Sequence, residues 1–121
     1  PAAADCLARL DPDTLAGRVG LRCASPDYLP IAGPAPDRKA FLQKFADLRN
    51  NARQTIDSGG PVMPGLYINT GHGSRGLTST PLVAECLASA MLGEPLPLSR
   101  HLQRALIPAR FLVRDLKRGK I

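Results

Sequence analysis

The sequence predicts a small mixed α/β fold with few strands and three to five helices, built as one unit over residues 1–121. Three observations lead to this prediction. A chain of 121 residues is long enough for one hydrophobic core and too short for several. Short runs with the two-residue period of a strand alternate with longer runs that have the period of a helix. A glycine-rich turn separates one of these strands from the helix that follows it.

The first third of the chain predicts one short helix and two strands. Residues 2–10 have a helical composition and end before a proline turn. Residues 17–24 alternate apolar residues with arginine or glycine, which is the pattern of a half-buried strand. Residues 28–32 form a second short extended run, and Pro30 disfavours a central position for it in a sheet.

A helix is predicted from residue 38 to about residue 51. The side chain of Asp37 can cap its first turn. Phe41, Phe45 and Leu48 have the spacing of a buried helical stripe, and the outer face of the helix is basic. We therefore expect the helix to pack through these three side chains.

The middle of the chain predicts a strand, a tight turn and a helix in direct succession. The strand covers residues 65–70, and the turn covers residues 71–76 and contains three glycines. Any of residues 78–80 can cap the helix, and Pro81 suits its first turn. Gly93 is expected to end the helix.

Two short helices, residues 98–106 and 108–117, complete the chain and carry its charge. The formal net charge is +6, and all of it lies in the last 22 residues. Basic residues four positions apart share one face of a helix and can bind phosphates without reading bases. The alternative is a solvated terminal helix whose cations interact with the helix dipole. The candidate nucleic-acid-binding residues on these helices (98–118) are Arg100, Arg104, Arg110, Arg114, Lys117 and Arg118.

The composition disfavours several classes of protein. No apolar run approaches the ~18 residues of a membrane span, and the N-terminus lacks the layout of a signal peptide. We therefore expect a cytoplasmic protein with no membrane partner. Cys6, Cys23 and Cys86 form no CxxC pair, so buried thiols are expected and a metal site is not. No Ser-His-Asp, HExxH or paired-carboxylate arrangement marks a catalytic residue.

The glycine-rich turn is the strongest candidate for a ligand site. A strand, a glycine-rich turn and a helix direct backbone N–H groups and a helix dipole at an anionic or electron-rich ligand. Gly71, Gly73 and Gly76 would permit close approach, but no acidic residue follows about 20 positions later, as a dinucleotide fingerprint requires. The same glycines suit a tight structural turn equally well. His72 and Arg75 share this ambiguity.

Three segments resemble a known family. Residues 17–37 contain G-L-R followed by D-x-x-P-x-x-G, and residues 65–88 contain the strand, glycine turn and helix; both resemble the D-amino-acid oxidase and glycine oxidase superfamily. The motifs RCASPDYLPIAG, GSRGL and PARF, the last within residues 95–120, give a sharper likeness. They resemble the C-terminal end of the FAD-dependent oxidoreductase half of bacterial bifunctional enzymes that make 5-methylaminomethyl-2-thiouridine in tRNA. The resemblance covers about residues 17–119.

This resemblance implies an activity and a set of site residues. In that family FAD accepts a hydride from the carbon beside an amine, the carboxymethyl group of carboxymethylaminomethyl-uridine at the wobble position is removed, and a methyltransferase half methylates the amine. Arg22 would bind the substrate carboxylate, with Asp27 or solvent as its alternative partner. Arg75 would help bind flavin or substrate, and the basic tail would bind tRNA phosphates. The residues implied beside the flavin are Gly71, His72, Gly73, Ser74, Arg75, Gly76, Leu77 and Thr78.

The chain departs from that family by what it lacks. The nucleotide-binding half with its GxGxxG motif and the methyltransferase half are absent from these 121 residues. We therefore expect a C-terminal fragment that does not retain FAD, is inactive alone and can self-associate through exposed strand edges. Two alternatives stay open. One is a fragment of another amine oxidase that acts on a free amino acid. The other is a small basic RNA-binding module, which the lack of aromatic residues for base stacking disfavours.

Overall fold

The computed structural model describes residues 11–14, 16–54, 56 and 59–121. The predicted helix at residues 2–10 and Cys6 lie outside the described residues. The described part contains four α-helices and two strands, which confirms the predicted mixed fold with few strands. The elements in chain order are the 3-10 helix η1 (Pro12–Thr14), β1 (Ile31–Pro36), α2 (Arg38–Lys44), the 3-10 helix η2 (Ala46–Arg49), β2 (Val62–Thr70), the 3-10 helix η3 (Gly73–Arg75), α3 (Gly76–Leu92), α4 (Arg100–Leu106) and α5 (Arg110–Lys117).

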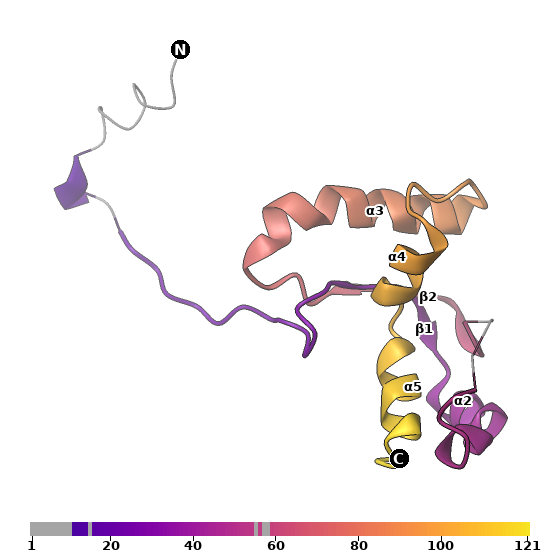
Figure 1. Ribbon diagram of the computed structural model, residues 1–121. Helices are drawn as coiled ribbons and strands as arrows, with labels where there is room; N and C mark the ends of the chain where they lie inside the picture. The colour runs from indigo at the N-terminus through magenta and orange to yellow at the C-terminus, as the bar shows by residue number, and fades with distance from the viewer. Residues whose placement is uncertain (1–10, 15, 55, 57–58) are drawn as a thin grey trace.

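The two strands form an antiparallel ribbon at the centre of the molecule (Figure 1). Ile31 pairs with Thr70, and the register shifts between Pro34 and Pro36. Within the described residues each strand has the other as its only sheet neighbour. Prolines are tolerated in β1 because an edge strand need not donate every backbone N–H to a ladder. The ribbon confirms the strand predicted at residues 65–70 and moves the one predicted at 28–32 toward the C-terminus.

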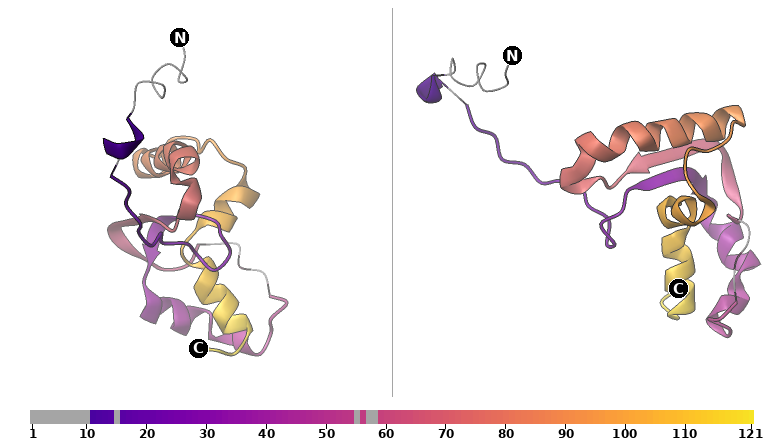
Figure 2. Two further views of the ribbon diagram at one scale, coloured as in Figure 1. Left: turned by 90° about the vertical axis from the view of Figure 1, so that its left-hand side faces the viewer. Right: turned by 45° about the horizontal axis from the view of Figure 1, so that its top comes forward.

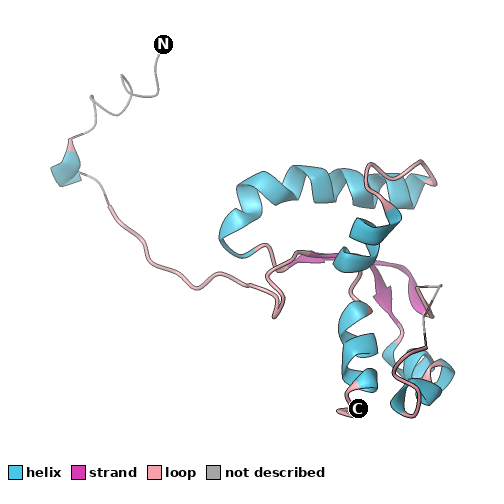
Figure 3. Ribbon diagram, in the orientation of Figure 1, coloured by secondary structure: helices cyan, strands magenta, loops and turns pink. Residues whose placement is uncertain are grey.

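The helices lie on two sides of the ribbon. α3 runs along one side, and α2 and α5 lie side by side on the other (Figures 1 and 2). α4 contacts both β1 and α5, and so links the two sides. The strands form the middle layer between these helices (Figure 3).

The main hydrophobic core lies between α2, η2 and α5. Phe41, Leu48 and Leu116 are fully buried there. The rings of Phe41 and Phe45 lie with their centroids 4.7 Å apart, which confirms the predicted apolar stripe. The predicted single helix is divided at Phe45, whose φ of −113° and ψ of 26° are not helical. The stripe survives this break because η2 keeps Leu48 in the same core as Phe41, with Phe45 packed against it.

The strand predicted at residues 17–24 is wrong for the described chain. Only Ala24 makes a strand-like bridge, to His72. Val19 and Leu21 are completely exposed, and nothing lies within 4 Å of a Cβ placed on Gly20. A strand needs a neighbour to accept and donate backbone hydrogen bonds, and this extended segment runs away from the other described elements (Figure 1).

The expectation of buried thiols is confirmed for one of the two described cysteines. Cys86 is buried as predicted, and burial raises the pKa of its thiol, whereas Cys23 is exposed. Among the described residues, no helix is both long enough and apolar enough to span a lipid bilayer.

Candidate functional site

The candidate site is built around the turn between β2 and α3. Gly71 has a φ of 74° and Gly73 a φ of 56°, which are left-handed conformations that favour glycine. The N–H of Gly73 donates to the carbonyl of Cys23 at 2.9 Å, so the turn is tied to the extended segment that carries Arg22. Gly76 has ordinary helical angles, with a φ of −55°. Two of the three predicted glycines are therefore required by the backbone.

α3 begins at Gly76, earlier than predicted, because the turn passes through η3 directly into the helix. The hydroxyls of Thr78 and Ser79 donate to the carbonyl of Arg75, each at 2.9 Å, and do not cap the helix. Arg75 at the cap position contributes no side-chain cap, and Pro81 lies inside the helix. The start of α3 therefore lacks a side-chain cap, and the positive end of its helix dipole lies at the glycine turn.

The imidazole of His72 bridges the end of β2 and the start of α3. Its Nδ1 lies 2.8 Å from the hydroxyl of Ser79, and its Nε2 lies 2.7 Å from Oδ1 of Asn69. Both ring nitrogens therefore have protein partners, and the side chain holds the turn in place. Sequence reasoning missed Asn69 and Ser79, since neither belongs to a motif.

Arg22 and Arg75 line the same open cleft, of about 520 Å³. Both side chains are exposed, and the described residues offer Arg22 no carboxylate partner. Thr78 lines a neighbouring hollow together with Tyr28 and Arg75, whereas Leu77 is 97% exposed on α3. The cleft thus unites most of the predicted site residues, and its lining is Gly20, Leu21, Arg22, Ala24, Tyr28, Gly71, His72, Gly73, Ser74 and Arg75.

The loop beneath the cleft is held by an ion pair that the sequence did not predict. Arg110 Nε lies 2.8 Å from Oδ2 of Asp27, and Nη2 lies 3.0 Å from Oδ1. Nη2 also donates to the carbonyl of Leu29, and Nη1 donates to those of Leu106 and Ile107. The hydrogen bond from Arg110 holds the pKa of Asp27 well below its usual range, with smaller help from the Ser25 hydroxyl.

This ion pair changes two of the sequence-based interpretations. Asp27 pairs with Arg110 and not with Arg22, so the alternative partner considered for Arg22 is occupied. The guanidinium of Arg110 uses its donors within the protein, so the structure does not offer it to phosphates. No local sequence pattern indicates the pair, because its members are 83 residues apart.

The other predicted basic residues differ in their surroundings. Arg100, Arg104 and Arg118 are exposed, and Lys117 is half-buried. Arg114 pairs with Asp115 at 3.1 Å, and its guanidinium also lies over the ring of Phe111, 4.9 Å from the ring centroid.

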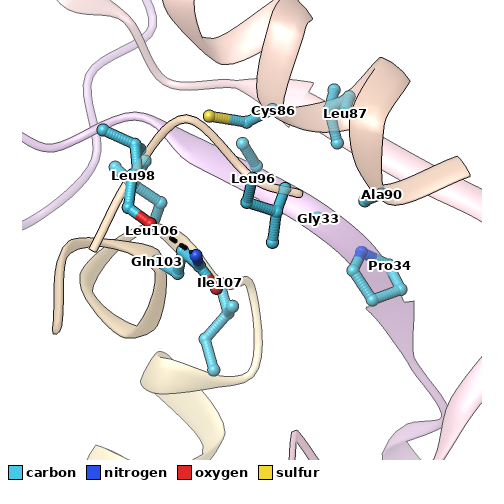
Figure 4. A pocket seen from close by; sticks show the side chains of 11 residues that line it. Gly33, Pro34, Cys86, Leu87, Ala90, Leu96, Leu98, Gln103, Leu106 and Ile107 are labelled. Carbon is cyan, nitrogen blue, oxygen red and sulfur yellow. Dashed lines mark hydrogen bonds between the residues drawn. The ribbon is translucent and has the colours of Figure 1, made fainter. Parts of the chain in front are cut away.

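The described residues contain one further cavity of interest, which is apolar, and no group of side chains that could bind a metal. An apolar cavity of about 110 Å³ lies between β1, α3 and α4, where Gln103 donates to the carbonyl of Leu98 (Figure 4). Among the described residues, no three His, Cys, Asp or Glu side chains form a metal-binding group.

A family model described as "FAD dependent oxidoreductase" (DAO) matches residues 1–90. This chain therefore belongs to the FAD-dependent oxidoreductase family, as the resemblance of residues 17–37 and 65–88 implied.

Among FAD-dependent oxidoreductases, the chain is similar to proteins that share one name. The chain is 52% identical over 113 residues to the "tRNA 5-methylaminomethyl-2-thiouridine biosynthesis bifunctional protein MnmC" of Pseudomonas syringae, covering 93% of the chain and 17% of the relative. It is 51% identical over 121 residues to the protein of the same name in Pseudomonas aeruginosa, covering 96% of the chain and 18% of the relative. A Pseudomonas putida protein with this name is 52% identical over 114 residues, or 94% of the chain and 17% of the relative. The chain thus spans less than a fifth of these relatives' length.

Proposed function

We propose that this chain forms one wall of the FAD and substrate site in a longer bifunctional enzyme that modifies tRNA in the cytoplasm. The oxidoreductase part of that enzyme removes the carboxymethyl group from carboxymethylaminomethyl-(2-thio)uridine at the wobble position. The observation that carries this proposal is an identity of about one half along nearly the whole chain to proteins named for that pathway. The methyltransferase and nucleotide-binding parts belong to the remaining length of such an enzyme.

The described residues fit the edge of a flavin ring. Gly71 and Gly73 adopt left-handed conformations that keep the turn tight, and both line the cleft in which a planar ring would lie. The positive end of the α3 helix dipole would lie beside an electron-rich ring edge. When bound, FAD supplies the acceptor for a hydride from the carbon beside the amine. Residues 71–78 would hold the ring, and His72 would keep the turn in shape through Asn69 and Ser79.

Arg22 is the residue we assign to the substrate carboxylate. Arg22 lines the cleft together with the glycine turn, and it has no carboxylate partner among the described residues, because Asp27 is paired with Arg110. A guanidinium presents two parallel N–H groups that match the two oxygens of a carboxylate. Arg75 lines the same cleft and would assist with substrate or flavin.

The same assignment implies how the chain would interact with tRNA, with FAD and with other copies of itself. The exposed cations Arg100, Arg104 and Arg118, with Arg114 and Lys117, would contact the tRNA backbone. The isolated chain would not retain FAD, because one wall of a site buries too little of the cofactor. It would also self-associate, since Val19 and Leu21 are fully exposed where further strands would cover them.

The test uses the full-length protein with Arg22→Ala. We expect wild-type protein to show flavin absorbance and to oxidise tRNA that carries carboxymethylaminomethyl-uridine. Arg22→Ala should keep the flavin and lose about a hundredfold in kcat/KM, because it lacks the charge-assisted pair, worth roughly 3 kcal/mol. Arg18→Ala removes an exposed cation from the same extended segment and serves as the control, with kcat/KM within about twofold of wild type.

Three results would contradict the proposal. A full-length protein without flavin would remove the oxidoreductase assignment. A protein that oxidises free glycine or another amino acid and leaves tRNA untouched would indicate a different amine oxidase. Full activity of Arg22→Ala would remove the role given to that side chain.

A further inference from the structure

In the folded chain, cations from a second segment lie beside those of the C-terminal tail. Residues 37–54 and 111–121 contain nine Lys and Arg residues and three Asp residues, so the two segments together have a formal net charge of +6. We call them the α2–α5 unit. Its cations are Arg38, Lys39, Lys44, Arg49, Arg53, Arg114, Lys117, Arg118 and Lys120.

Packing holds the two segments of the α2–α5 unit together. Phe41, Leu48 and Leu116 form its fully buried centre. At one end, Arg49 Nε donates to the backbone carbonyl of Ile121 at 2.8 Å. This hydrogen bond joins η2 to the end of the chain next to Lys120, and the views agree that these ends lie together (Figures 1 and 2). Cations that are about 70 residues apart in sequence therefore belong to one packed unit.

The carboxylates of the unit neutralise few of these cations. Asp37 accepts the N–H of Ala40 as the cap of α2, and Asp115 pairs with Arg114. Within the described residues Arg38, Lys39, Arg53, Arg118 and Lys120 are exposed and have no acidic partner. Like charges crowded on a small unit repel one another, and a polyanion that binds across them releases its own counterions as it does so.

We propose that the α2–α5 unit binds the phosphate backbone of the RNA substrate, with cations of α2 and η2 contributing as much as those of α5. The proposal rests on the proposed function, which makes tRNA the substrate. A phosphate-directed contact suits this surface because its aromatic rings are occupied elsewhere. Phe41 and Phe45 pack in the core, and the Phe111 ring lies under two guanidinium groups, so they are not platforms for base stacking.

The same packing argues against a lipid surface as the partner. An amphipathic helix binds a membrane through its apolar face. The apolar face of α5, with Leu112, Val113 and Leu116, is turned into the core against α2 and η2. What the unit presents to solvent is charge without an apolar patch beside it.

The test measures tRNA affinity of the full-length enzyme by fluorescence anisotropy, with labelled tRNA as the probe. The variant Lys39→Gln, Lys44→Gln, Arg53→Gln removes three exposed charges from the α2 side and leaves the C-terminal tail intact. We expect it to bind tRNA about tenfold more weakly at physiological salt. The slope of log affinity against log salt should fall by about two, since each lost phosphate contact removes about 0.7 to 0.9.

The control variant Lys39→Arg, Lys44→Arg, Arg53→Lys keeps the charge and changes the side chains, and it should bind within about twofold of wild type. Flavin absorbance reports that both variants are folded around the cofactor. Unchanged tRNA affinity and salt slope in the neutral triple would overturn the proposal. If that variant instead lowers only the thermal unfolding temperature, the surface contacts the rest of the enzyme, which also overturns it.

Failure of this inference is distinguishable from failure of the proposed function. Wild-type enzyme that carries flavin and oxidises tRNA, while the neutral triple binds tRNA normally, refutes the α2–α5 unit alone. Wild-type enzyme without flavin, or without activity on tRNA, refutes the proposed function.

Discussion

Replacing Arg110 by Met tests whether the pair with Asp27 holds the loop beneath the cleft. Met keeps an unbranched side chain that can cover the ring of Phe111, but it removes the charge and every donated hydrogen bond. The loop carries Tyr28, a non-glycine residue at a φ of 59° that lines the cleft. A conformation of this kind is costly and persists where the surrounding contacts enforce it, and these contacts come here from Arg110 and Ser25.

The magnitude follows from the exposure of the two partners. Breaking a fully buried ion pair costs about 3–5 kcal/mol, and an exposed pair contributes about 0–1 kcal/mol. The side chain of Arg110 is 12% exposed and that of Asp27 is 36% exposed, so the pair lies between these limits. We expect the local opening free energy of the loop to fall by about 2 kcal/mol, which corresponds to roughly a 30-fold change in an equilibrium constant.

Hydrogen exchange of the full-length protein measures this change directly. The N–H of Leu29 donates to Oδ1 of Asp27 at 3.2 Å, so a peptide that spans residues 25–31 reports on the loop. Exchange of its protected amides should become about 30-fold faster in Arg110→Met. Arg118→Met removes an exposed cation from the end of the same helix and should leave this peptide unchanged. Unaltered exchange in Arg110→Met would refute the view that the pair holds the loop.

The remaining predictions concern a glycine in the core, a glycine in the turn and the response to acid. Gly60→Ala should lower the free energy of unfolding, measured by urea denaturation, by about 3 kcal/mol. Its φ is +76°, and the new Cβ would lie 2.4 Å from the Phe41 ring. A loss below about 1 kcal/mol would contradict this packing. Gly73→Ala should cost only about 1–2 kcal/mol, since its φ is +56° and Ala24 lies at an ordinary 3.5 Å, but it should weaken flavin retention, measured by absorbance after dialysis. Because the pKa of Asp27 is depressed in the folded protein, its stabilisation is fully present above the unfolded carboxyl pKa of about 3.9 and is lost as pH falls below it. The difference in loop exchange between wild type and Asp27→Asn should therefore be constant near neutral pH and shrink in acid, and a difference that grows on acidification would show the opposite sign.

Local patterns predicted most of the elements. The apolar stripe of Phe41, Phe45 and Leu48 and the strand before the glycine turn are both present. The boundaries of the elements were predicted less accurately. α3 begins at Gly76 because the backbone of the turn is already helical there, and the hydroxyls of Thr78 and Ser79 turn back to a carbonyl when they could have capped the helix. Propensity alone does not distinguish these two uses of a hydroxyl, which depend on where the preceding turn ends.

The sequence by itself determined the fold class, the place of the glycine turn and the family, because periodicity and motifs are properties of neighbours along the chain. Only the tertiary structure decided which charges meet. It joined Asp27 to Arg110 across 83 residues, left Arg22 facing the cleft, and gathered the net charge of two distant segments into the α2–α5 unit. The physical reason is that an ion pair or a charged surface depends on distances through space. Those distances are set by how the helices and the ribbon pack, and no local pattern encodes them.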